Sequence, residues 1–228
     1  MTEQIPMTPK EKLANFWTYH WKLILVILGV AAFVVIGVVS MLVQPNYDTS
    51  ILVATAGKRI RIDTPVIVAL QRKLEEYGRD VNGDGQVRIL LDVIDYPSSE
   101  FSQSNMAEDV RLTAELQAGD SQLYLFDKTI YERFVEQDHY ENLAALFPNY
   151  DIPMVTAVPV RDTLLADVSF PLPEEGLAER QTEEDYYADA NALLDDLVLV
   201  MRTDPGVKED RRETQLALLQ ALLDASFQ

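Results

Sequence analysis

Cysteine is absent from the 228 residues of this chain. Without cysteine there can be no disulfide framework, no thiolate zinc site, no cysteine nucleophile and no lipid-anchored lipobox cysteine. Histidine occurs only at His20 and His139, which argues against an all-histidine metal site. Positive charge is also scarce, because 19 basic residues face 37 acidic ones and give a net charge of −18. A chain this acidic repels phosphate groups, so we expect no nucleic-acid partner.

Recognised catalytic motifs are missing as well. The sequence contains no nucleophile elbow, no HExxH zinc motif and no phosphate-binding GxxxxGK[ST] loop. Two acidic stretches, Glu183–Asp185 and Asp195–Asp196, have no histidine or cysteine near them in sequence. Acidic residues at a helix start complement the helix dipole, which is a sufficient reason for the first stretch. We therefore expect a protein that is not an enzyme and that needs no organic cofactor.

One long apolar run is the dominant feature of the sequence. Leu23–Val43 holds 21 residues without a charge, and at 1.5 Å per residue a helix of this length spans about 31 Å. That length matches a membrane hydrocarbon core of about 30 Å. A belt of aromatic residues at the headgroup level precedes the run; it comprises Phe16, Trp17, Tyr19 and Trp21. Thr8, Pro9 and Glu11 indicate a helix start. The sequence therefore predicts one helix from about Pro9 to about Val43, with its first turns in or near the interface.

The apolar run is interpreted as an uncleaved anchor rather than a signal peptide. Val38–Ser40 has residues small enough for a cleavage site. However, the preceding region is long, and the run exceeds the roughly 7–15 apolar residues of a signal peptide. Three lysines lie before the run, and the first positive charge after it is Lys58. The positive-inside rule then places the N-terminus in the cytoplasm and everything after Gln44 outside.

These observations divide the chain into four parts. Residues 1–22 form a cytoplasmic or interfacial arm, 23–43 a transmembrane helix, 44–50 a tether and 51–228 an extracytoplasmic domain of a single-pass cell-membrane protein. Of the charged side chains, 16 basic and 35 acidic ones follow the apolar run, a net charge of −19. This excess has two explanations, the solubility of the outer part or the attraction of cations or of a basic partner.

The first half of the outer part alternates between apolar runs and helical patterns. The apolar runs predict strands at Ile51–Ala56, Val87–Ile94 and Leu123–Phe126. The helical patterns, with their caps and glycine stops, predict helices at Thr64–Tyr77, Ser104–Gln117 and Thr129–Val135. This order favours an α/β domain with a parallel sheet and right-handed crossovers, in which central strands are covered by helices on both faces.

The second half is less regular. Met154–Val160 is a candidate strand, and Glu183–Leu194 is a helix with Thr182 and Asp185 as its cap pair. Leu197–Met201 could extend that helix, but its β-branched content favours a strand. A final helix is expected over Glu209–Ala225.

The segment DVRLTAELQAGDSQLYLFD, Asp109–Asp127, resembles the first lobe of bacterial extracellular solute-binding proteins of the two-lobed type. The matching features are a helix that ends in Ala118-Gly119-Asp120 and a strand that ends in aspartate. The resemblance implies that the first predicted strand lies between the second and the third. This chain departs from the family in two ways, because family members normally continue into a second lobe that closes over the ligand, and because soluble receptors have a signal peptide or a lipidated cysteine where this chain has an anchor. We therefore expect a shortened, membrane-anchored relative.

The resemblance leaves two functions open. The outer domain could be a binding or accessory module, solute-binding-protein-like but without a second lobe. It could instead be a structural or assembly subunit that contacts a neighbouring membrane complex, such as a transporter, without a small-molecule ligand. A pocket lined by aromatic residues at the strand ends would favour the first function, and a contiguous exposed apolar patch would favour the second.

A calcium-loop pattern opens the second predicted strand. The residues at positions 1, 3, 5 and 7 of an EF-hand-type loop would be Asp80, Asn82, Asp84 and Gln86, with Gly85 at position 6. Position 9 is Arg88 and position 12 is Leu91, which removes the second half of such a site. The alternative is a tight turn, for which Asn-Gly-Asp-Gly supplies the positive-φ residues. We expect the turn to be the main role and any calcium binding to be weak.

A basic loop is the second candidate site. In open α/β sheets, ligands lie beyond the carboxyl ends of the strands, at helix N-termini. Lys58, Arg59 and Arg61 follow the first predicted strand, and Thr64 starts the next helix. The loop could therefore bind an anionic ligand, or it could be a solvated loop that pairs with the abundant carboxylates.

Overall fold

The computed structural model of the protein describes residues 8–43, 46–57, 64–96, 105–119, 121–137, 140–173, 177, 181–203 and 209–224. The chain separates into two compact units, Met1–Asn46 and Tyr47–Gln228. Each unit is considered by itself below.

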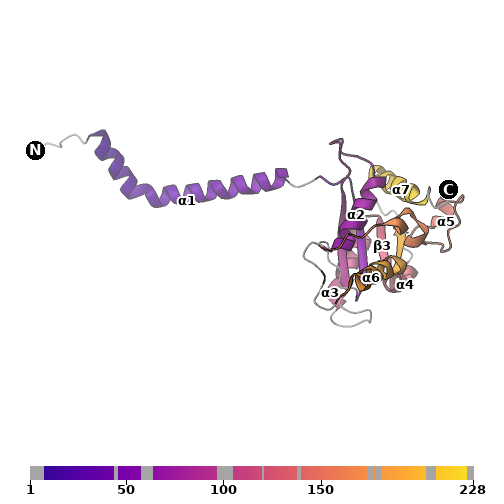
Figure 1. Ribbon diagram of the computed structural model, residues 1–228. Helices are drawn as coiled ribbons and strands as arrows, with labels where there is room; N and C mark the ends of the chain where they lie inside the picture. The colour runs from indigo at the N-terminus through magenta and orange to yellow at the C-terminus, as the bar shows by residue number, and fades with distance from the viewer. Residues whose placement is uncertain are drawn as a thin grey trace, which may run out of the picture. The chain divides into compact units, whose positions relative to one another are not determined.

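The first unit consists of one long helix, α1, which runs over the 35 residues Pro9–Val43 and confirms the predicted bounds (Figure 1). A window of 22 residues within it, Phe16–Gly37, has a mean hydropathy of 2.2, and none of this window is buried. The aromatic residues before the apolar run are exposed too, with Tyr19 at 78%. By length and composition α1 could cross a membrane, and a signal sequence would have the same properties.

The second unit is built on a five-stranded sheet with the strand order β2-β1-β3-β5-β4. β1 (Thr49–Ala56) pairs in parallel with β2 (Ile89–Tyr96) on one side and with β3 (Leu123–Asp127) on the other. The predicted neighbourhood of these three strands, with the first one in the middle, is therefore confirmed.

The remaining two strands make the sheet mixed, so the expectation of a parallel sheet is wrong for this part. β5 (Leu197–Met201) runs antiparallel to β3, and the short strand β4 (Ala157–Pro159) runs antiparallel to β5. Leu197–Met201 is a strand, as preferred from its sequence. All five residues of β5 are buried. A strand that is apolar at every position looks the same whether it runs parallel or antiparallel to its neighbour, so the sequence does not indicate the antiparallel direction of β5.

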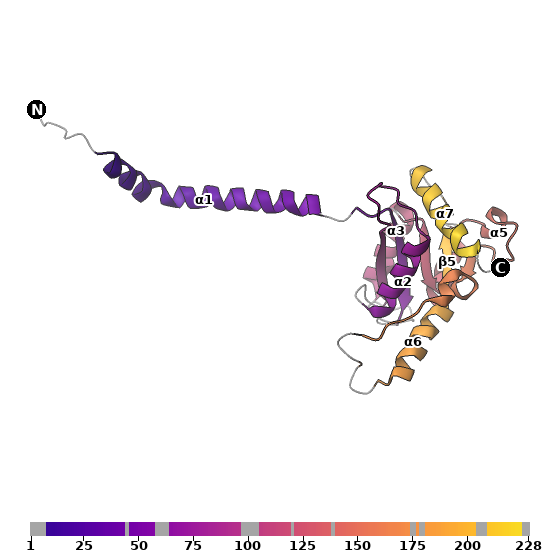
Figure 2. The same ribbon diagram turned by 45° about the horizontal axis from the view of Figure 1, so that its top comes forward.

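Helices cover both faces of the sheet (Figure 2). Ile51 and Val53 of β1 face a core formed with α2 (Pro65–Tyr77), α6 (Glu183–Asp196) and α7 (Glu209–Asp224). Leu52 and Ala54 face a second core formed with α3 (Met106–Ala118) and α4 (Lys128–Phe134). This arrangement explains why β1 is apolar at every position from Ile51 to Ala56 except Thr55. Short α5 (Leu143–Leu146) lies between α4 and β4 in sequence.

Two of the helix starts in the second unit were predicted from cap residues. Thr182 and Asp185 form a reciprocal capping box at α6, as the sequence indicates. Thr64 precedes α2, and Pro65 occupies its first turn, but the Thr64 side chain makes no capping hydrogen bond. The start of α2 therefore depends on the fixed φ of proline rather than on a side-chain cap.

Candidate functional site

The carboxyl ends of β1 and β3 are joined by a buried carboxylate. Asp127, which is 2% exposed, accepts hydrogen bonds from the Ala56 backbone N–H at 2.5 Å and from the Ile130 backbone N–H at 2.8 Å. It thus caps α4 and holds the end of β1 at the same time. Ligands bind at the carboxyl ends of the strands in open α/β sheets. At this position Asp127 stabilises the fold instead, because its carboxylate accepts hydrogen bonds from the protein backbone.

Most of the predicted basic site falls outside the described residues. Lys58, Arg59 and Arg61 lie outside the described residues, while Thr64 lies directly before α2. Gly57, the last described residue before them, has a φ of 71°, a conformation that favours glycine. The anionic-ligand hypothesis for this loop therefore stays a prediction.

The calcium-like loop is described completely, and its side chains bond its own backbone. Asp80 accepts hydrogen bonds from the N–H groups of Gly83 at 2.6 Å and Gly85 at 2.7 Å. Asn82 accepts one from Asp84, and Asp84 accepts one from Gln86, both at 2.9 Å. Gly83 and Gly85 have φ values of 74° and 82°, which glycine adopts without strain. The loop therefore forms the tight turn that its sequence predicts.

Two further features of this loop bear on metal binding. Arg88, at the ninth position, forms an ion pair with Asp84 at 3.0 Å and donates to the Gln86 carbonyl oxygen Oε1 at 2.7 Å. A cation would have to compete with this guanidinium for the Asp84 carboxylate, because position 7 of such a loop binds the metal through its backbone carbonyl. In the described part of the chain, no group of three His, Cys, Asp or Glu residues is arranged to hold a metal ion.

A further carboxylate, which no motif in the sequence points to, fixes this loop. Asp48, just before β1, accepts hydrogen bonds from the backbone N–H groups of Val81 at 2.8 Å, Asn82 at 3.1 Å and Arg88 at 2.8 Å. Burial alone raises the pKa of Asp48, but these backbone hydrogen bonds, with the charge of Arg88, bring the pKa below its ordinary value. Asp48 therefore clamps the calcium-like loop to the start of the sheet.

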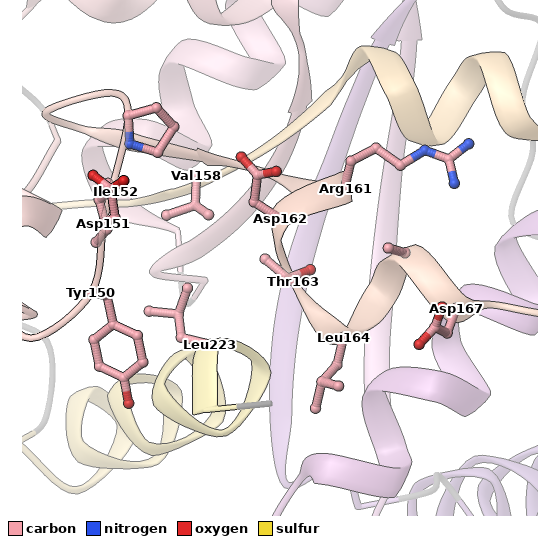
Figure 3. A pocket seen from close by; sticks show the side chains of 12 residues that line it. Tyr150, Asp151, Ile152, Val158, Arg161, Asp162, Thr163, Leu164, Asp167 and Leu223 are labelled. Atoms are coloured by element: carbon pink, nitrogen blue, oxygen red, sulfur yellow. The ribbon is translucent and has the colours of Figure 1, made fainter. Parts of the chain in front are cut away.

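A cavity of about 550 Å³ lies beside β4, in the size range of small-molecule sites (Figure 3). It is bounded by the segment Tyr150–Pro153, by the 3₁₀ turns Val160–Asp162 and Leu164–Asp167, and by the last turn of α7. Both apolar side chains and carboxylates line it; the side chains shown include Val158, Leu164, Leu223, Asp151, Asp162 and Asp167.

An arginine that lines this cavity is held by a neighbouring helix. Arg161 and Asp162 are adjacent in sequence but point in opposite directions (Figure 3). The Arg161 guanidinium forms an ion pair with Asp195 and donates to the Asn191 carbonyl at 3.2 Å, so it is bound to α6. The chemistry of the cavity suits a cationic group with an apolar stem. A pocket lined by aromatic residues at the strand ends would have favoured a binding module. Among the described residues, however, Tyr150 is the only aromatic side chain that lines this cavity, and its lining includes no residue from the ends of β1 and β3.

An exposed apolar face occurs on α3. Leu112 and Leu116 are buried against the sheet, whereas Met106 and Val110 are 56% and 69% exposed. Met106 and Val110 lie one turn apart and therefore share one face of the helix. The helical spacing of the apolar residues predicts that Met106 and Val110 lie in this helix. That spacing does not distinguish the apolar residues that face the sheet from those that face away from it.

A buried arginine is the polar residue that sequence reasoning missed most clearly. Arg202 is 2% exposed and lies just past β5. Its guanidinium donates to three carbonyl groups at the end of α3, those of Glu115 at 2.8 Å, Leu116 at 3.1 Å and Gly119 at 2.9 Å. Nothing in the local pattern MRTDPG distinguishes this side chain from a solvated one.

Comparison of the chain with protein-family models, with curated proteins and with solved structures finds no match.

Proposed function

We propose that this protein is a single-pass, membrane-anchored module whose α/β domain lies outside the cytoplasm and acts as a binding or accessory domain. The observation that carries the proposal is the apolar window Phe16–Gly37, none of which is buried, in a chain whose second unit has its own two-sided core. Exposed apolar surface on this scale is stable only if something other than water covers it. A lipid bilayer is the covering that its length fits.

The relationship to solute-binding proteins is part of this proposal. The strand order β2-β1-β3, with both pairs parallel, is the order that the resemblance implies. The antiparallel β5 and the use of Asp127 as a structural carboxylate are features of this chain. Fold alone does not give a ligand, so the proposal names a binding module and no reaction.

A reporter fusion tests the location of the domain. A periplasmic-type reporter enzyme fused after Gln228 should be active, and the same fusion with a reporter that works only in the cytoplasm should be silent. The opposite pattern would overturn the orientation. N-terminal sequencing of the membrane-bound chain tests the anchor, because a mature chain that starts at Met41 would show that the helix is a cleaved signal peptide.

The cavity beside β4 is the candidate binding site for a small molecule. A panel of organic cations and anions can be screened by thermal unfolding of the full chain in detergent. Binding by a cation at this cavity should raise the melting temperature and should be lost in Asp162→Asn. Asp92→Asn is the matched control, because Asp92 is a half-exposed aspartate of β2 that pairs with Arg111 away from the cavity.

The alternative function, a structural or assembly subunit, is favoured by one observation. Met106 and Val110 expose apolar surface on one face of α3, which is a feature of protein–protein contact sites. In that case Val110→Asp should weaken co-purification of a membrane-protein partner after cross-linking, while the melting temperature of the isolated protein changes little.

The matched control for Val110→Asp is Ala188→Asp. Ala188 is an exposed residue of another helix, α6. The control thus adds the same charge to an exposed helical position away from α3. If the face of Met106 and Val110 binds the partner, Ala188→Asp should leave the co-purification largely intact. An equal loss in both variants would show that the added charge, and not the apolar face, is responsible.

A further inference from the structure

The cavity beside β4 carries negative charge on three separate segments of its lining. Asp151 lies before β4, Asp162 ends one 3₁₀ turn and Asp167 ends the next. All three residues are exposed. Among the described residues, Asp151 and Asp167 form no ion pair with a basic side chain. A ligand in this cavity therefore meets carboxylates at several separate places.

The basic side chain Arg161 does not offset these carboxylates. Its guanidinium forms an ion pair with Asp195 and donates to the backbone and side-chain carbonyl oxygens of Asn191, both at 3.2 Å. Figure 3 shows the Arg161 side chain directed away from that of Asp162. Among the described residues that line the cavity, Arg161 carries the only positive charge. The cavity therefore attracts cations, and an anionic ligand would have to displace an existing ion pair.

Apolar surface lies between the carboxylates. In Figure 3, Val158 is placed between Asp151 and Asp162, and Leu223 approaches from the last turn of α7. Val158 and Leu223 are buried members of the core on this face of the sheet, and Leu164 packs against the same core while it stays partly exposed. A ligand that spans two of the carboxylates therefore needs an apolar stem between its charged groups.

The aromatic ring of Tyr150 forms a further, fixed part of the lining. The Tyr150 hydroxyl donates to Asp224 of α7, and its ring makes an edge contact with Phe147 at a centroid distance of 6.0 Å. The negative face of a tyrosine ring attracts ammonium groups. Because the ring is already held by these two contacts, little side-chain freedom is lost when a cation binds against it.

A metal ion or a single small cation does not match this lining. In the part of the chain that the structure describes, no group of three His, Cys, Asp or Glu residues is arranged to hold a metal ion. A volume of about 550 Å³ is also far larger than one ion needs. A ligand with one ammonium group could neutralise one of the separate carboxylates and would leave the apolar surface between them uncovered.

We propose that the cavity beside β4 binds an aliphatic diamine or polyamine, with ammonium groups at Asp151 and Asp162 and the methylene chain over Val158 and Leu223. Each ammonium group donates charge-assisted hydrogen bonds to a carboxylate, and the methylene groups are removed from water against the apolar side chains. This inference rests on the proposed binding function and names the ligand class of that site.

Two amines with the same alkyl chain test the need for two charges. The diamine cadaverine and the monoamine pentylamine are each titrated calorimetrically into the full chain in a non-ionic detergent. Cadaverine should bind about fivefold more tightly or better, which is the factor that one partly exposed ion pair contributes at most. Equal affinities for the two amines would overturn the proposal.

Lysine tests the charge of the cavity, because it is cadaverine with an added carboxylate. Lysine should bind more weakly than cadaverine, since the added carboxylate meets the negative lining and Arg161 is already paired. An affinity for lysine equal to or above that for cadaverine would contradict the proposal, because it would show that Arg161 or another cation receives the carboxylate.

Two charge-neutralising variants locate the ammonium groups. Asp151→Asn and Asp162→Asn should each bring the affinity for cadaverine down to about that for pentylamine, because each leaves one carboxylate of the pair. Asp92→Asn is the control and should change neither affinity, because Asp92 pairs with Arg111 on β2 and does not line the cavity. A preference for cadaverine that survives both replacements would show that the diamine binds elsewhere on this acidic domain, and would overturn the site.

The remaining outcomes separate this inference from the proposed function. A monoamine or an anion that binds more tightly than cadaverine, and is lost in Asp162→Asn, would overturn the diamine and leave the binding module intact. A two-lysine peptide that binds far more tightly than cadaverine or spermidine would also overturn it, in favour of a basic segment of a protein partner. Binding by none of these compounds would overturn the inference together with a small-molecule role for this cavity. The reporter fusion tests the location of the domain in every case.

Discussion

Replacing Arg202 by methionine should have the largest effect of any single polar substitution in the outer domain. The guanidinium makes three hydrogen bonds to the last turn of α3, with donor–acceptor distances from 2.8 to 3.1 Å. Those carbonyl groups belong to the end of a helix, where partial negative charge accumulates and a cation is stabilising. Methionine has a similar length and fills the space, so the substitution mainly removes the donors and the charge.

The magnitude follows from the three carbonyl groups that lose their donor. A hydrogen bond to a charged group contributes about 1.5–3 kcal/mol, and a buried acceptor left unpaired costs about 1–3 kcal/mol. The contributions are not additive, because the three acceptors share one guanidinium. We expect a total loss of about 3–5 kcal/mol, the range found when one partner of a buried charged contact is removed. In a domain of this size that loss lowers the melting temperature by roughly 6–20 °C.

The assay is thermal unfolding of the full chain in detergent, followed by the near-ultraviolet circular dichroism of its tyrosines. Both tryptophans, Trp17 and Trp21, lie in α1, so the tyrosine signal reports mainly on the outer domain. Arg202→Lys keeps the positive charge but loses the planar, forked arrangement of the guanidinium N–H donors. The stability of this variant should therefore lie between those of the natural chain and Arg202→Met. The control is Arg111→Met, because Arg111 is 49% exposed in its ion pair with Asp92 and should contribute less than about 1 kcal/mol. A loss below about 1 kcal/mol in Arg202→Met would refute the reasoning.

Three other predictions concern the sheet and its first loop. Leu91 is 0% exposed in β2, so Leu91→Ala should cost about 2–5 kcal/mol in the same unfolding assay, and a cost near zero would show that β2 is not buried as described. Asp48 has a lowered pKa in the folded state, so it stabilises the fold above its unfolded pKa of about 3.9, and this contribution is lost as the pH falls through the folded value. Asp48→Asn should therefore reduce stability at pH 7 and flatten its fall below about pH 4; an unchanged pH profile would contradict the clamp. For calcium, a Kd near 1 mM would add only about 0.4 kcal/mol at an equal free concentration, so a large stabilisation at micromolar calcium that is lost in Asp80→Ala would show that the turn is a true metal site.

The parts of the fold that could be predicted are those encoded by local patterns. The bounds of α1 follow from Thr8, Pro9 and an uninterrupted apolar run, and the capping box of α6 is visible in Thr182 and Asp185. The order of β1, β2 and β3 needed the resemblance to a known family, because two-sided apolar strands alone do not say which of them is central.

The parts that could not be predicted depend on contacts between distant segments. The direction of β5 is set by its pairing with β3, and its apolar residues read the same both ways. Asp48 binds a loop more than 30 residues away, and Arg202 binds a helix more than 80 residues before it. Single aspartates and arginines in a chain with 37 acidic and 19 basic residues carry no mark that sets these two apart. The cavity beside β4 is formed by several separate segments, which no local motif brings together.

The most direct test of the central claim uses the absence of cysteine. A single cysteine can be placed on each side of the proposed anchor without a background signal, at Thr8→Cys before the apolar run and at Val81→Cys in the outer domain, where the natural side chain is 51% exposed. Intact cells are then treated with a membrane-impermeant maleimide, before and after permeabilisation. A membrane-anchored extracytoplasmic domain predicts labelling of Val81→Cys in intact cells and of Thr8→Cys only after permeabilisation. Labelling of Val81→Cys only after permeabilisation would contradict the account.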